Sequence, residues 1–130
     1  MTNAITLNVD LLDGLERGTD EYGQANLKMV MNFALEVVRD ISLENALAAV
    51  KGELETPVIY PTDLAKYITV KLFEQSHYYA ELWSKVWGSV LPDVIMFWAE
   101  CDSYNYIQED GSIWVDIEEL HAEMTAAKAS

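Results

Sequence analysis

Apolar residues recur at helical spacing through most of the chain, and this pattern limits the fold more than any other feature. Within residues 24–41 they fall at the i, i+3, i+4 intervals of a core-facing helical stripe. A similar stripe runs through residues 62–89, and a very apolar segment covers residues 93–101. We therefore expect a mainly α-helical fold, with about five helices around one core.

Local signals suggest where these helices begin and end. Ser42 is a good N-cap for a short helix through Lys51, and Gly52 is a plausible stop. Pro92 stands where the first position of a new helix would be. The long helix within residues 62–89 either continues unbroken or bends near Ser76, and the pattern does not decide between these two.

The pattern changes to strand-like alternation within residues 104–117. This segment contains Asp110-Gly111, a dipeptide that readily adopts the positive φ angles of a two-residue hairpin turn. We predict a small β-hairpin here, followed by a last helix over about residues 116–127 whose apolar side is Ile117, Leu120 and Met124. Residues 55–61 carry two prolines and predict an extended connector that packs under a neighbouring element.

Composition indicates one folded domain over residues 1–130. The 130-residue chain is 51% hydrophobic and holds four Trp and seven Tyr, which is too apolar for a disordered acidic tail. The one cysteine, Cys101, cannot form an internal disulfide and is expected in the core. The start does not resemble a secretory signal, and no apolar run reaches the roughly 20 residues of a membrane span. We expect a cytoplasmic protein.

Charge restricts the choice of partner. Twenty-two acidic residues oppose eight basic ones, giving a formal net charge of −14, and no Lys or Arg occurs between Lys85 and Lys128. Nucleic-acid phosphates and anionic membranes would be repelled, so neither is expected as a direct partner. A basic surface on another protein is the expected complement.

The last predicted helix places Asp116, Glu119 and Glu123 in one row. Successive charges in such a row are about 5–6 Å apart, comparable to the spacing of charges along a nucleic-acid strand. Glu109 and Asp110 lie nearby in sequence, and strand alternation turns Trp114 away from Ile113 and Val115, as a binding anchor would be. The alternative is that these acids only solvate the outer face of a helix.

The leading hypothesis is a non-enzymatic binding protein that needs no cofactor. Its partner-binding residues are those that supply negative charge or an apolar anchor, namely Glu109, Asp110, Trp114, Asp116, Glu119 and Glu123. Such a protein could mimic a nucleic acid and inhibit a DNA- or RNA-handling enzyme, as a phage or plasmid counter-defence factor would. No phosphate-binding loop or nucleophile motif is present, so no reaction is predicted.

A second hypothesis is a small helical metalloprotein. Both histidines follow a glutamate by three residues, as His77 follows Glu74 and His121 follows Glu118. Two Glu-x-x-His pairs belong to the ligand set of di-metal carboxylate bundles. Helical phase argues against this site, because Glu74 and His77 fall opposite the apolar stripe of their helix.

A third hypothesis concerns self-association. A second apolar row formed by Met29, Phe33 and Val37 widens the stripe of the first helix beyond what a small core needs. These side chains either lie deeper in the core or form an interface with a second copy of the chain.

Overall fold

The computed structural model describes residues 7, 9–53 and 58–129. Its elements are, in chain order, the 3-10 helix η1 (Val9–Leu12), α1 (Asp20–Val50), β1 (Val58–Ile59), α2 (Pro61–Gln75), α3 (His77–Cys101), β2 (Asn105–Ile107), β3 (Ile113–Val115) and α4 (Ile117–Ala129). The mainly helical class and the small sheet before the last helix are confirmed. The described residues form four α-helices instead of the five expected.

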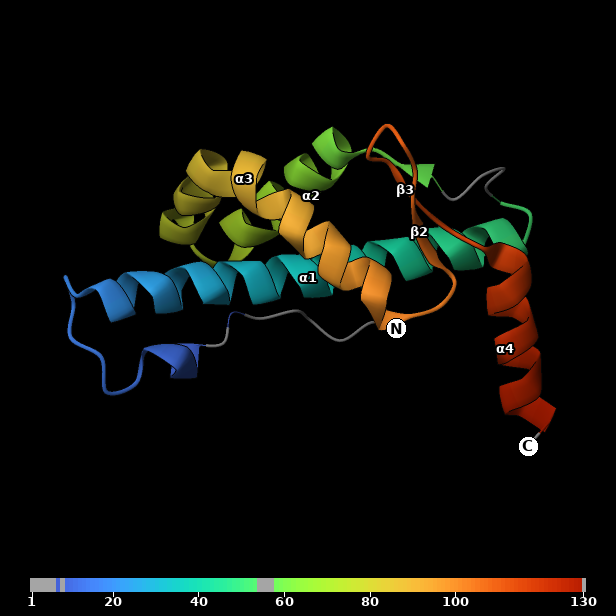
Figure 1. The fold of residues 1–130 in the computed structure, drawn as a ribbon, viewed down its shortest axis with the longest axis horizontal. Helices are drawn as coiled ribbons and strands as arrows, with labels where there is room; N and C mark the ends of the chain where they lie inside the picture. The colour runs from blue at the N-terminus through green and yellow to red at the C-terminus, as the bar shows by residue number, and fades with distance from the viewer. Residues whose placement is uncertain (1–6, 8, 54–57, 130) are drawn as a thin grey trace.

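Helix α1 runs along the longest dimension of the molecule (Figure 1). Helices α2 and α3 lie across it and pack against each other, and α3 also contacts α1 and β2. The sheet and α4 lie toward the C-terminal half of α1, while the junction between α2 and α3 lies toward its N-terminal half (Figure 1). The hairpin and α4 are therefore at the same end of the molecule.

Helix α1 continues through Ser42, where the sequence suggested a new helix. No Gly or Pro interrupts residues 24–51. The Ser42 hydroxyl does not cap a helix but donates to the carbonyl of Arg39, one turn earlier (3.1 Å). The helix ends where Gly52, at φ +80°, allows Glu53 N–H to donate to the Ala48 carbonyl. Gly52 is thus the stop that the sequence predicted.

The second long apolar stripe divides into two helices at Ser76. This residue is extended (φ −165°, ψ 121°), and its hydroxyl accepts a long hydrogen bond from Tyr79 N–H (3.5 Å). Helix α3 then continues through Pro92 instead of starting there. Pro92 cannot donate to the Gly88 carbonyl, but both residues are exposed, so water can satisfy that carbonyl.

The sheet is antiparallel and has the order β1-β3-β2. The predicted hairpin is present, but its connection is longer than the predicted two-residue turn. A two-residue type I′ turn needs two residues with positive φ, and only Gly111 has positive φ here (+86°). Gln108 N–H donates to the Ser112 carbonyl (2.8 Å) and closes a wider loop. Residues 55–57 of the predicted extended connector lie outside the described residues. Its next two residues form β1, which pairs Ile59 with Ile113.

Helix α4 begins as predicted. Asp116 Oδ1 accepts hydrogen bonds from the N–H groups of Glu118 (3.1 Å) and Glu119 (3.2 Å), the pattern of an N-cap. Leu120 is buried in the core, and Ile117 and Met124 pack against it. The apolar side of this helix is therefore the one that the sequence predicted.

Two tryptophans of α3 hold the core together. Trp83 and Trp98 are almost completely buried, and each indole N–H has an acceptor on another helix. Trp83 Nε1 donates to the Ala65 carbonyl of α2 (3.3 Å), and Trp98 Nε1 donates to Ser42 Oγ of α1 (2.9 Å). The hairpin is joined to the same helix, because Asn105 Nδ2 donates to the Trp98 carbonyl (2.8 Å).

Two sequence expectations are corrected by burial. Met29, Phe33 and Val37 are at most 2% exposed, so they are part of this chain's own core and offer no surface to a second copy. Cys101, expected in the core, is exposed because it is the last residue of α3. Among the described residues, no helix combines the length and apolar character that a membrane crossing requires.

We predict that Ser42→Ala destabilises the fold. The change leaves the buried Trp98 N–H without its acceptor, which costs about 1–3 kcal/mol of unfolding free energy. Ser89→Ala is a matched control, because Ser89 is also in a helix but its hydroxyl bonds only to the Val86 carbonyl of its own turn. Urea unfolding of the two variants measures the difference. Equal stability would contradict the role given to the Trp98–Ser42 bond.

Two glycine substitutions should change the stability of the fold in opposite directions. Gly52→Ala forces an L-residue into positive φ and should destabilise the protein by about 1–2 kcal/mol. Gly23→Ala lies within α1, where an added Cβ meets nothing within 4 Å, and should stabilise it by about 0.5–1 kcal/mol. Thermal unfolding followed by circular dichroism measures both changes in stability. A change in the same direction for both variants would contradict these backbone conformations.

Candidate partner-binding surface

An open cleft of about 400 Å³ lies between α1, the end of α3 and the hairpin. Helix α1 contributes the polar residues Glu36, Arg39 and Asp40, which stand three and four positions apart and so share one side of the helix. The end of α3 and the following residues contribute Trp98, Asp102, Tyr104 and Asn105.

Three carboxylates and one guanidinium group line this cleft, so its charge is negative. Glu36 and Arg39 are exposed, while Asp40 and Asp102 are partly buried. Sequence reasoning missed the contribution of α1, although the polar side of that helix was visible in its periodicity. Nothing in the sequence indicated that this side would meet the residues that follow α3.

Tyr104 lines the cleft close to carboxylates from two parts of the chain. Burial raises the pKa of its hydroxyl, and the nearby carboxylates of Asp102 and Glu123 raise it further. The hydroxyl also hydrogen-bonds to Asp102, which raises the pKa as well, and only Arg39 acts in the opposite direction. Residues from α1, the loop after α3 and α4 therefore influence one phenol.

Helix α4 brings its predicted acidic row to this region. Ser103 Oγ donates to Glu119 Oε1 (2.6 Å), and Glu123 acts on Tyr104. Asp116 caps the helix through Oδ1, so its carboxylate has a structural role in addition to its charge. Within the predicted set, Glu119 and Glu123 are the members that the structure brings together with Asp102.

Glu109 and Asp110 lie apart from that row. They are in the loop that joins β2 to β3, whereas Asp116 follows the other end of β3. Asp110 Oδ1 accepts hydrogen bonds from both the N–H (2.9 Å) and the hydroxyl (2.5 Å) of Ser112. These bonds lower the pKa of the Asp110 carboxyl below its usual range. The predicted acids thus form two groups, one at each end of the hairpin.

Trp114 lies on the outer face of the sheet. Its neighbours in β3, Ile113 and Val115, are buried, while Trp114 is partly exposed, as alternation predicted. Tyr106 of β2 pairs with Trp114, and their rings stack with centroids 4.9 Å apart. A stacked aromatic pair is therefore accessible on this face.

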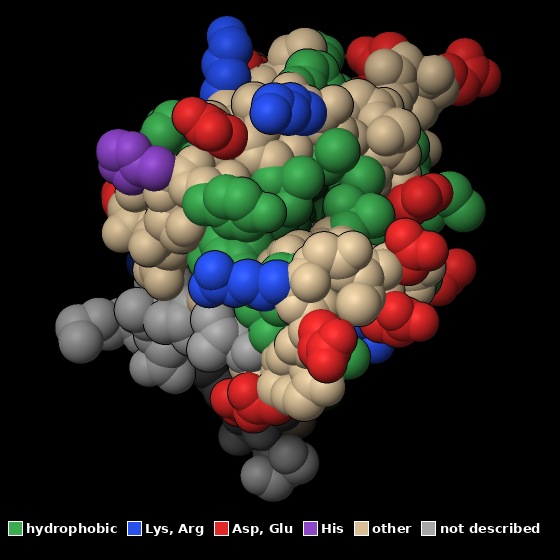
Figure 2. All heavy atoms as spheres, turned by 90° about the vertical axis from the view of Figure 1, so that its left-hand side faces the viewer, with side chains coloured by type: hydrophobic (Ala, Val, Ile, Leu, Met, Phe, Trp, Pro, Cys, Tyr) green, Lys and Arg blue, Asp and Glu red, His purple; other side chains and the backbone are tan. Residues whose placement is uncertain are grey.

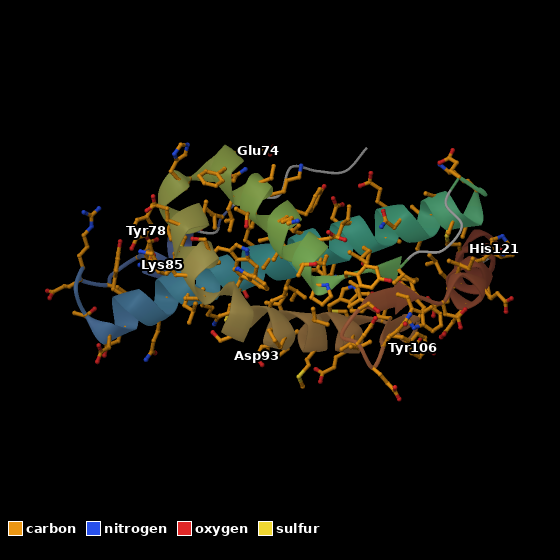
Figure 3. The ribbon with its side chains drawn as sticks, turned by 90° about the horizontal axis from the view of Figure 1, so that it is seen from above. Glu74, Tyr78, Lys85, Asp93, Tyr106 and His121 are labelled. Atoms are coloured by element: carbon orange, nitrogen blue, oxygen red, sulfur yellow. The ribbon has the colours of Figure 1, made fainter. Side chains whose placement is uncertain are left out.

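Few basic groups neutralise these acids. Lys71 Nζ and Glu74 Oε2 of α2 form an ion pair between described residues (3.9 Å). It lies near the junction of α2 and α3, far from α4 (Figure 3).

The opposite end of the molecule carries charges of both signs. Figure 2 shows hydrophobic side chains gathered at the centre of this face, with Lys and Arg side chains beside them and Asp and Glu side chains around its edge. A hollow here is lined by Arg17, Tyr22, Tyr78 and Tyr79. Tyr79 donates its hydroxyl to the buried Asn26 Oδ1 (2.7 Å), which gives that tyrosine a structural role.

The residues of the metal hypothesis do not converge. Glu74 and His121 lie far apart (Figure 3), because Glu74 is in the last turn of α2 and His77 begins α3, whereas Glu118 and His121 are in α4. Among the described residues, no group of three or more His, Cys, Asp or Glu side chains is arranged to hold a metal ion. The exposed His77 ring instead packs edge-on against Phe73, with centroids 5.2 Å apart.

Comparison of the chain with models of known protein families, with curated protein sequences and with solved structures found no match.

We predict that Asp102→Asn lowers the pKa of Tyr104 toward 10.0 without reaching it, because burial is the larger cause of its increase. A raised tyrosine pKa contributes stability that is fully present below the ordinary pKa and is lost as pH rises through the folded pKa. The pH window of this effect is therefore alkaline. NMR titration of the tyrosine rings measures the change.

Tyr79 serves as an internal control in that titration. Its pKa is also raised, first by burial and then by Tyr22 and Tyr78, and Asp102 has no part in it. A Tyr104 pKa that does not respond to Asp102→Asn, or a Tyr79 pKa that shifts equally, would contradict the local charge coupling described above.

Proposed function

We propose that this protein is a non-enzymatic binding protein that docks its acidic C-terminal end on a basic surface of another protein. The observation that supports this most is the position of Asp102 and Glu123, which both act on Tyr104, while Arg39 is the cation found to oppose them among the described residues. Glu119 lies next to this pair, because it accepts a hydrogen bond from Ser103. Uncompensated charge of this kind favours a cationic partner and speeds its association.

Several of the acidic side chains are also held in position by hydrogen bonds, which adds to this support. Hydrogen bonds from Ser103 and Ser112 and from the first turn of α4 hold the carboxylates of Glu119, Asp110 and Asp116 in place. Acidic side chains that are already held in place lose less conformational entropy on binding than side chains that the partner must order.

A nucleic-acid-binding enzyme is the class of partner that this surface fits best. Acids at one-turn intervals on α4 repeat at a spacing of about 5–6 Å, near that of phosphates along a strand. Such a surface would occupy the basic groove in which an enzyme holds DNA or RNA and would inhibit it. Phage or plasmid counter-defence is a setting in which this inhibition would be useful.

The test replaces three carboxylates at the docking end by amides of the same size. The variant Asp116→Asn/Glu119→Gln/Glu123→Gln loses three charges but retains the cap of α4 and the acceptor for Ser103. We expect it to associate on the order of tenfold more slowly at low salt with the basic protein captured from a nuclease-treated lysate. The difference should nearly vanish at about 0.5 M salt, where charges are screened within a few ångströms.

A matched control distinguishes the effect of charge at the docking end from the effect of net charge. Asp13→Asn/Glu16→Gln/Glu21→Gln removes three exposed carboxylates near the start of α1, so the net charge changes equally. Stopped-flow or surface-based kinetics should show almost the wild-type association rate for it. Equal effects of the two triple variants, or capture that is indifferent to salt, would overturn the proposed docking end.

A further inference from the structure

A second hollow, also about 400 Å³, differs from the acidic cleft because it is apolar. It lies between α3 and the hairpin loop, beside Pro61 at the start of α2. None of its lining residues carries a charged side chain. Leu91 and Ile95 are at its floor and belong to the buried core, so the groove opens directly onto that core.

Ile107 shows that the groove lies beside an uncovered part of the core-facing side of the sheet. The register of the sheet pairs Ile107 with Ile113, so both side chains point to the same face. Ile113 is completely buried, but Ile107 is 42% exposed. An inward-facing isoleucine remains in water because no described element of the chain covers the groove beside it.

Met96 forms the opposite wall. It is 58% exposed, although its neighbour Ile95 is buried. Exposed apolar walls above a buried apolar floor are unfavourable in water, and burying them in a complex is a source of binding free energy. Methionine also adapts its flexible side chain to different apolar partners.

Gly88 keeps the floor of the groove open. It lies within α3, where a glycine costs about 1 kcal/mol relative to alanine. A Cβ added there would meet nothing within 4 Å, so the protein's own packing does not require a glycine at this position. The absence of a side chain leaves room for one from a partner.

Acidic residues border this groove at the hairpin. Asp110 directly precedes the lining residue Gly111, and Glu109 is next to it. On α3, the exposed Asp93 follows Pro92 and stands one turn before Met96. Lys85 is exposed on the same helix, two residues before the lining residue Trp87. An apolar floor with mostly acidic borders complements a segment that is apolar on one side and basic on the other.

We propose that this groove binds a short amphipathic helix of the partner protein, with its apolar side against Gly88, Met96 and Ile107 and its Lys or Arg residues beside Asp93, Glu109 and Asp110. Helices commonly dock in apolar grooves through residues spaced at i, i+3 and i+4. This inference rests on the proposed function, because it assigns the same basic partner an apolar anchor in addition to its charge.

The experiment uses the full chain and a synthetic amphipathic helix of Leu and Lys as the probe. Two control peptides replace Leu by Ser, which keeps the charge, or Lys by Glu, which keeps the apolar side. Gly88→Leu fills the groove, and Gly23→Leu adds the same side chain to open space near the start of α1. Affinity is measured by isothermal titration, and each variant's folding is checked by thermal unfolding.

We expect Gly88→Leu to weaken binding of the Leu/Lys peptide at least tenfold and Gly23→Leu to leave it unchanged. In wild-type protein, the methyl NMR signal of Met96 should shift on titration, while that of the buried Met29 should not. This spectrum tests the site even if a variant folds poorly. Both control peptides should bind more weakly than the Leu/Lys peptide.

Several results would overturn the inference. Equal affinity of the Leu/Lys peptide for the wild type and Gly88→Leu, with no shift of the Met96 signal, would show that the groove is not used. The charge-based docking would still stand in that case if the Ser/Lys peptide bound. Equal binding of the Leu/Glu peptide would remove the requirement for a basic partner. Concentration-dependent dimers in light scattering, abolished by Gly88→Leu, would identify a second copy of this chain as the occupant instead.

Discussion

The structure depends on the two indole N–H groups of α3 and their acceptors. Burying a tryptophan is favourable for its ring, but its N–H must keep a hydrogen bond to avoid a desolvation cost. Trp83 finds its acceptor on α2 and Trp98 finds one on α1. These bonds fix α3 against both neighbouring helices, and the hairpin is then fixed to α3 through Asn105.

This arrangement determines where the acidic groups lie. Trp98 forms part of the wall of the acidic cleft, and its carbonyl receives the Asn105 side chain that places the hairpin. The hairpin leads into α4, whose Glu119 is bound by Ser103 in the loop after α3. The end of α3, the hairpin and the start of α4 are therefore linked by side-chain hydrogen bonds, and the carboxylates on them have defined positions.

The two candidate surfaces lie at different places around the hairpin. Its loop, with Asp110, borders the apolar groove, whereas its other end leads to the acidic cleft and α4. A partner that used both would have a basic surface and an apolar helix. Charge would then guide its approach, and the groove would add contacts that are not screened by salt.

Periodicity predicted the helical class, the hairpin and the inward side of α4, because these depend on patterns within a few residues. It misplaced the boundaries at Ser42 and Pro92. Helix α3 continues through Pro92 because the exposed Gly88 carbonyl can bond to water, whereas at Ser42 a contact from a distant residue adds to the local signals. Ser42 is an acceptor for Trp98, 56 residues away, and this need could not be read from its surroundings. The contribution of Glu36 and Asp40 to the cleft was missed for the same reason, since it depends on how α1 meets the hairpin.

Carboxyl footprinting of the full chain, free and bound to its captured basic partner, tests the central claim most directly. Carbodiimide labelling read by mass spectrometry should show protection of Asp102, Glu119 and Glu123 on binding and no change at Asp13 or Glu16. Protection confined to the start of α1, or labelling that is identical in the free and bound states, would contradict the acidic C-terminal end as the docking surface.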